Sequence, residues 1–111
     1  MEVSESAGEF EQVVLLAILR LEDHAYGVSI GNEIRVCAGR STTPGAIYTT
    51  LERLERKGWI VARCGEATPE RGGRAKRFYT VTKSGRAQLV SAQRAFQKLM
   101  NGLGLLGESN G

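Results

Sequence analysis

The chain has 111 residues, of which 41% are apolar, and it carries a formal net charge of +3. This length predicts one domain, which can bury a core but has little room for a large active-site cavity. No apolar run is long enough to span a bilayer, and the acidic N-terminus lacks the basic start of a secretory signal, so we expect a cytoplasmic protein with no membrane segment.

The charges are distributed unevenly along the chain. Residues 1–34 contain seven acidic residues and one arginine, a net charge of −6, whereas the remaining residues contain 14 basic and five acidic residues, a net charge of +9. Residues 71–98 contain eight basic residues and no acid. We expect this part of the chain to bind an anionic partner. The alternative is a basic face that is only solvated and binds no anion.

The N-terminal part predicts a disordered segment followed by an apolar helix. Residues 1–9 show no periodicity, whereas residues 9–21 are apolar almost all round between Val13 and Leu19. A helix of this kind must be covered from two sides. We expect a second subunit to supply one cover, over Val13, Val14, Leu16 and Ala17; burial in the chain's own core is the alternative.

The next two helices have the proportions of a helix-turn-helix. A helical pattern over residues 26–38 ends at Gly39, and a second helix over residues 44–57 follows after only five residues. Thr43 and Pro44 suit the start of this second helix, and Gly58 suits its end. Gly31 inside the first helix is costly unless another helix crosses closely there.

The helix over residues 44–57 has two different faces. Ile47, Leu51 and Leu54 form a core-facing stripe, while the opposite face carries small residues in its first half and arginines in its second half. A face pared down in this way suggests an N-terminal half pressed against the major groove of DNA. Gly45 allows close approach, and Thr49 and Arg53 are expected to read bases. The flanking DNA contacts are expected from Thr43, Tyr48 and Arg56.

After Gly58 the sequence changes to a strand pattern. Residues 59–63 and 77–81 predict two strands rich in β-branched and aromatic residues. Their connection contains glycines and a concentration of cations, which predicts a wing, a basic finger that lies on a phosphate backbone or enters a minor groove. The cations expected to bind DNA are Arg71, Arg74, Lys76 and Arg77. A solvated loop is the alternative.

The last predicted helix begins after Thr82 and runs to about residue 102. Its apolar positions repeat with a spacing of three and four residues, as in a coiled-coil seam, at Leu89, Ala92, Phe96, Leu99 and Leu103. A helix of this length spans roughly 30 Å, so part of it should project and pair with a partner. The sequence therefore predicts a mainly α, α+β fold: a winged helix-turn-helix over residues 10–81, a dimerisation helix over 82–103 and a flexible tail over 104–111.

Other types of site find little support in the sequence. Cys37 and Cys64 have no CxxC spacing and are expected to be buried or half-buried, and His24 has no ligand or acid–base partner at useful spacing. No paired carboxylates and no nucleophile beside a base are present, so we expect neither an enzyme nor a metal or other cofactor.

Three motifs resemble the PadR-like winged-helix transcriptional regulators of bacteria. These motifs are AYG at 25–27, PGAIYTTLERLERKGWI at 44–60 and ERGGRAKRFYTVTKSG at 70–85, and the resemblance covers roughly residues 10–90. It implies a homodimer that binds double-stranded DNA at a pseudo-palindromic operator, usually as a repressor, with the first and last helices in the dimer interface. The single last helix is similar to the short branch of the family.

The resemblance also allows release from the operator by a small molecule bound at the dimer interface. Relatives that bind planar drugs there use a tryptophan on the last helix, whereas the sole aromatic residue of this last helix is Phe96. The alternative function is a winged-helix protein-interaction module, in which the basic face binds an acidic protein partner instead of DNA.

Overall fold

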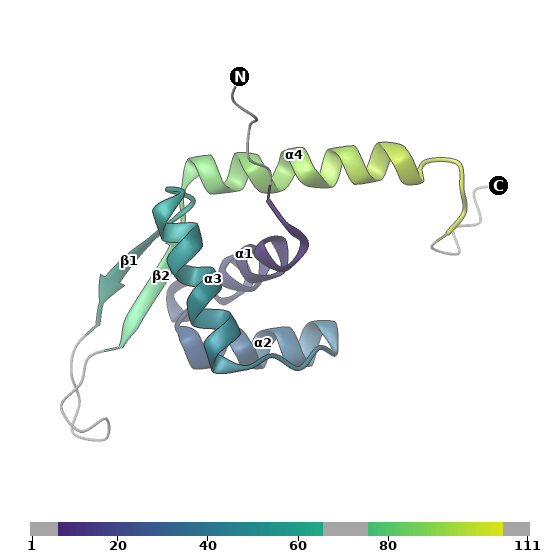
Figure 1. Cartoon of the computed structure of the whole chain (residues 1–111). Helices are drawn as coiled ribbons and strands as arrows, with labels where there is room; N and C mark the ends of the chain where they lie inside the picture. Colours follow the sequence, from purple (N-terminus) through teal and green to yellow (C-terminus); the bar gives the residue numbers. More distant parts are fainter. Residues whose placement is uncertain (1–6, 66–75, 106–111) are drawn as a thin grey trace.

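The computed structural model describes residues 7–65 and 76–105, and in this part the chain forms four α-helices, a short 3-10 helix and one two-stranded antiparallel sheet (Figure 1). The order is α1 (Glu9–Leu21), η1 (Glu22–His24), α2 (Gly27–Ala38), α3 (Pro44–Arg56), β1 (Ile60–Cys64), β2 (Arg77–Val81) and α4 (Lys83–Met100). Helix α1 thus begins at the last residue of the segment that was expected to be disordered. None of the described helices is long and apolar enough to cross a membrane.

Helix α1 is the centre of the core and contacts α2, α3, α4 and β2. Its residues Val14, Leu15 and Ile18 are almost completely buried. The expectation that a second subunit covers Val14 and Ala17 is therefore wrong, because the chain's own elements bury both residues. The apolar residues of α1 that are not fully buried are Leu16, which is exposed, and Phe10, Val13, Leu19 and Leu21, which are half-buried.

The close crossing of α2 and α3 explains the glycine inside α2. A Cβ atom on Gly31 would lie 3.1 Å from Cδ1 of Ile47, so a larger residue would require the Ile47 side chain to shift by a few tenths of an ångström. Gly39 ends α2 in the left-handed conformation with φ 63°, which glycine adopts at little cost. The helix-turn-helix predicted from the sequence is confirmed.

Helix α3 begins at Pro44 as its sequence signals predict and ends at Arg56, one residue earlier than predicted. The side chain of Thr43 accepts a hydrogen bond of 3.1 Å from the amide of Ala46, Pro44 is the first helical residue, and Gly58 has φ 79° just after the end. Ile47, Leu51 and Leu54 are buried, as the stripe predicts.

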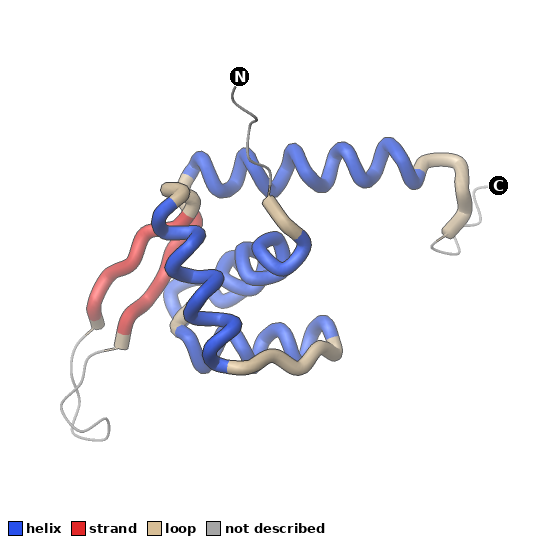
Figure 2. The backbone as a smooth tube through the Cα atoms, in the orientation of Figure 1, coloured by secondary structure: helices blue, strands red, loops and turns tan. Residues whose placement is uncertain are grey.

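The two strands pair in antiparallel register, from Ile60 opposite Val81 to Cys64 opposite Arg77. The amide of Tyr79 donates to the carbonyl of Ala25 at 2.9 Å, which fixes the hairpin to the connection between α1 and α2. Figure 2 shows the two strands lying side by side next to α3, with their open ends away from α4. The first strand begins one residue later than predicted.

Helix α4 packs on the core through its N-terminal half, and further along the helix the side chain of Gln93 donates to Gln12 of α1 at 2.9 Å. Thr82 accepts a hydrogen bond from the amide of Gly85, and a Cβ atom on Gly85 would collide with the carbonyl of Trp59. Leu89 is buried in the core, whereas Phe96 and Leu99 further along the helix are 62% and 75% exposed. In Figure 1 this second half runs beyond α1.

Both described cysteines lie at the surface, so the expectation that they are buried is wrong. Cys37 lies on the outer side of the last turn of α2, and Cys64 ends β1 where the hairpin leaves the core. The thiol of Cys37 donates to the carboxylate of Glu33 at 3.1 Å, and this hydrogen bond raises the pKa of the thiol. The residues described contain no group of three or more His, Cys, Asp or Glu side chains that could hold a metal ion.

Candidate nucleic-acid interface

The outer face of α3 is a row of exposed residues opposite the buried stripe. Gly45, Thr49 and Arg56 are exposed and share this face, since positions four and seven residues apart lie on the same side of a helix. No atom of another element lies within 4 Å of the place where a Cβ atom of Gly45 would stand. The N-terminal half of α3 therefore presents a thin, open surface that another molecule can approach closely.

This surface lies on the side of the molecule away from α4. In Figure 1 the N-terminal end of α3 and the open end of the β1–β2 hairpin both lie on that side, and α2 lies next to them. Thr43 is exposed at the start of α3, where its oxygen accepts from the amide of Ala46, so its hydroxyl hydrogen is still able to donate to an anion.

The cations of α3 differ in how far they are already engaged. The guanidinium of Arg53 lies 3.6 Å from the carboxylate of Glu11, so part of its charge is balanced within the chain. Arg56 is exposed and forms no ion pair with any residue that the structure describes. Of the two predicted contacts, Arg56 is thus the freer cation, and Arg53 must share its charge with Glu11.

Glu11 itself is buried at the junction between α1 and α3. Its carboxylate accepts from the amide of Gly8 at 2.8 Å and from the ammonium of Lys57 at 2.9 and 3.2 Å. Burial opposes ionisation of this carboxyl, but the Gly8 amide, Lys57 and Arg53 together hold its pKa below the ordinary value. The ammonium of Lys57 also lies 4.6 Å from the ring centre of Trp59, a buried core residue.

Arg77 at the start of β2 and Lys76 just before it also contact neighbouring side chains. Arg77 forms an ion pair of 2.9 Å with Glu55 of α3, and this carboxylate raises the pKa of the guanidinium. The ammonium of Lys76 lies 4.0 Å from the centre of the Tyr26 ring. The other two predicted wing cations, Arg71 and Arg74, lie outside the described residues.

The side chain of Tyr48 on α3 packs against the first residue of α2, Gly27. A Cβ atom on residue 27 would overlap with the hydroxyl end of the Tyr48 ring. Any residue other than glycine at position 27 would therefore displace the ring. Tyr48 remains half exposed. The glycine of the AYG motif and the tyrosine of the PGAIY motif are thus a single packing unit.

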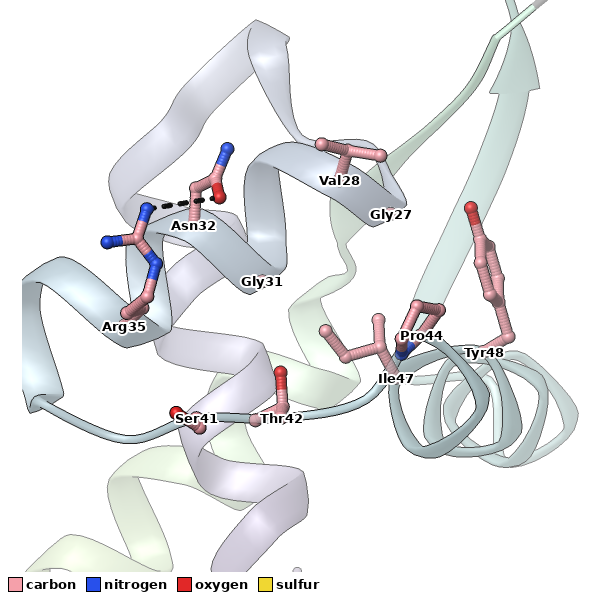
Figure 3. Close-up of a pocket in the computed structure, with 10 residues that line it drawn as sticks. All are labelled: Gly27, Val28, Gly31, Asn32, Arg35, Ser41, Thr42, Pro44, Ile47 and Tyr48. Carbon is pink, nitrogen blue, oxygen red and sulfur yellow. Dashed lines mark hydrogen bonds between the residues drawn. The ribbon is translucent and has the colours of Figure 1, made fainter.

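Beside Tyr48, a cavity of about 250 Å3 opens between α2, the turn and the start of α3 (Figure 3). Its walls are apolar where Ile47 and Pro44 line it, and Asn32 and Arg35 form a polar edge, joined by a hydrogen bond of 3.4 Å. The volume is below the roughly 300–1,000 Å3 of typical ligand pockets, so we treat it as part of the open surface of the helix-turn-helix.

Sequence reasoning missed one residue of the α3 row. Glu52 is exposed and lies seven residues after Gly45 and three after Thr49, so it belongs to the same face. The helical spacing alone places Glu52 on this face. A search for basic residues does not find it, because its side chain is a carboxylate.

The residues predicted for a dimer interface fall into three groups. Val14, Ala17 and Leu89 belong to the chain's own core, whereas Val13 and Ala92 are half-buried. Leu16, Phe96, Leu99 and Leu103 are exposed, and Leu103 lies beyond the end of α4 at Met100 rather than on the helix.

Comparisons with known proteins agree with this geometry. The transcriptional regulator PadR-like family matches residues 15–91 of the chain. The transcriptional regulator Rv3488 of Mycobacterium tuberculosis is 39% identical over 61 residues, which cover 55% of this chain and about half, 53%, of that protein.

Two solved structures illustrate the similarity in fold. A PadR-like transcription factor from Bacteroides fragilis has a TM-score of 0.72 and 22% identity over 90% of this chain and 91% of that chain. Bacillus subtilis PadR in complex with operator DNA has a TM-score of 0.63 and 24% identity over 77% of this chain and 48% of that chain. The winged-helix fold predicted from the sequence is confirmed.

Proposed function

Because the chain belongs to the PadR-like family of transcriptional regulators, we propose that it binds a specific DNA sequence by placing α3 in the major groove. The observation that carries the proposal is the open outer face of α3, where small residues precede the free cation Arg56. An α-helix fits the major groove with its exposed face against the base edges. The structural relative solved with operator DNA supports this reading.

The proposal includes a homodimer in the cytoplasm that binds a two-fold operator as a repressor. It is supported by the exposed apolar side chains of Phe96 and Leu99 on the half of α4 that extends past α1, together with Leu16 on α1. Two half-sites one turn of B-DNA apart, about 34 Å, would then face two copies of α3.

The experiment is a binding titration with DNA from the promoter of the protein's own gene and with a scrambled duplex of equal length. Arg56→Ala should weaken binding to every sequence and reduce the slope of log affinity against log salt by about 0.9, as expected for one lost phosphate contact. The matched control is Arg94→Ala, which removes the same charge from the exposed surface of α4. Equal losses for the two variants would show that only net charge matters.

A second function, binding to an acidic protein partner, is favoured by one observation on α4. Lys83, Arg86, Arg94 and Lys98 are exposed along a shallow face of this helix with Val90 between them, and no acid lies on the helix. The titration separates the two functions, because wild-type protein that shows no specific shift at moderate salt would favour the protein partner.

A further inference from the structure

We propose that Glu52 reads a cytosine in the operator, with its carboxylate accepting a hydrogen bond from the N4 amino group in the major groove. This inference rests on the proposed function and deepens it, because it assigns one base preference to one side chain.

The position of Glu52 on α3 places it in the middle of the exposed row. Positions 45, 49, 52 and 56 lie within about 60° of one another at 3.6 residues per turn. They lie opposite Ile47, Leu51 and Leu54, which are fully or almost fully buried. If α3 enters the groove with this face inward, Glu52 points at the base edges between Thr49 and Arg56.

The carboxylate of Glu52 is also free, unlike the others near α3. Glu55 is paired with Arg77 at 2.9 Å, and Glu11 is buried against Lys57. Glu52 is exposed and forms no ion pair or hydrogen bond with any residue in the described ranges, although Arg56 lies one turn away at a spacing that permits a pair. Its acceptor capacity is therefore available to a ligand.

A free carboxylate in this place is selective because it can only accept hydrogen bonds. Cytosine presents the N4 donor in the major groove, and adenine presents the N6 donor beside the acceptor N7, whereas guanine presents two acceptors, N7 and O6, and thymine presents the acceptor O4. Opposite guanine or thymine, a carboxylate oxygen would face an acceptor atom of the base with no hydrogen between them. The phosphates would in addition repel the negative charge of the carboxylate, with no hydrogen bond to offset this repulsion. Glu52 would thus favour cytosine, pair less well with adenine because N7 opposes its second oxygen, and exclude guanine and thymine, and these effects together contribute to specificity.

The test is selection of binding sites from a randomised duplex, followed by titrations in which each operator position is changed to all four bases. Wild-type protein should require cytosine at one position of each half-site and lose about 5- to 100-fold in affinity with another base there. Glu52→Ala should bind the four bases at that position alike. Glu52→Gln should shift the preference toward adenine, since a glutamine amide pairs with adenine N6 and N7.

The control is Glu22→Gln, an equal change of charge at an exposed residue of η1 that should leave every base preference as it is. Circular dichroism checks that the variants keep the fold. The proposal is overturned if Glu52→Ala binds all sequences more tightly by the same factor and keeps the wild-type preferences. Wild-type protein that selects no sequence at all would instead overturn the proposed function itself.

Discussion

At the scale of single residues, the carboxylate of Glu11 links the start of α1 to the end of the helix expected to enter DNA. It accepts from the Gly8 amide and from Lys57, and it lies near Arg53. A lone buried carboxylate would be strongly unfavourable, so the surrounding donors are what make the position stable. The same arrangement limits how freely Arg53 can turn toward a base.

We expect Glu11→Gln to lower the free energy of unfolding by about 1.5–3 kcal/mol at pH 7, the range for a hydrogen bond to a charged group. The pKa of Glu11 is lower in the folded chain than its ordinary value of 4.5. Its stabilisation is therefore complete above that value and is lost as the pH falls through the folded pKa. The difference between wild type and variant should shrink in that window, measured by urea unfolding at pH 7 and at pH values below 4.5.

Glu9→Gln is the control for this prediction, because Glu9 lies on the same helix and pairs with Arg40 while its side chain is 72% exposed. An exposed pair contributes little, so this variant should change stability by less than about 1 kcal/mol. A Glu11→Gln effect that stayed constant across the pH range would show that packing, and not charge, makes the difference.

At the scale of elements, the helices with explicit end signals were the easiest to predict. The boundaries of α3 follow from Thr43, Pro44 and Gly58, because each acts on its own neighbours in sequence. The contact of Arg53 with Glu11 could not be predicted in this way, since the two residues are 42 positions apart and periodicity within one helix does not reveal its neighbours. The central place of α1 was missed for the same reason.

The junction of α2 and α3 offers a test at this scale. Gly27→Ala should displace the Tyr48 ring and weaken DNA binding, while stability changes by less than about 1 kcal/mol, because alanine favours the helix and a ring end can move. Titrations of Gly27→Ala, Tyr48→Ala and the double variant form a cycle. If the effect acts through Tyr48, Gly27→Ala should cost nothing more in the Tyr48→Ala background, and additive losses would contradict this explanation.

At the scale of the whole molecule, α4 lies along one edge of the structure, and the helix-turn-helix and the hairpin lie to one side of it (Figure 1). The N-terminal end of α3, the end of β1 and the start of β2 lie away from α4 (Figure 1), so pairing along α4 would leave this side of the molecule free. The apolar seam of α4 begins in the core at Leu89 and continues to the exposed Phe96 and Leu99. One continuous stripe thus serves folding at one end of the helix and is available for association at the other.

We therefore expect Leu99→Glu to produce a monomer where wild-type protein is a dimer, measured by light scattering at micromolar concentration. Leu99 is 75% exposed in the single chain, so its replacement should leave the fold intact while placing a charge in the apolar interface. The control is Val36→Glu, at a side chain on α2 that is 71% exposed and lies outside the seam. On DNA, the monomer should lose affinity for a two-half-site operator but keep the weak affinity of wild type for a single half-site. A Leu99→Glu protein that remains a dimer would remove α4 from the interface and require another surface to hold the two copies on the operator.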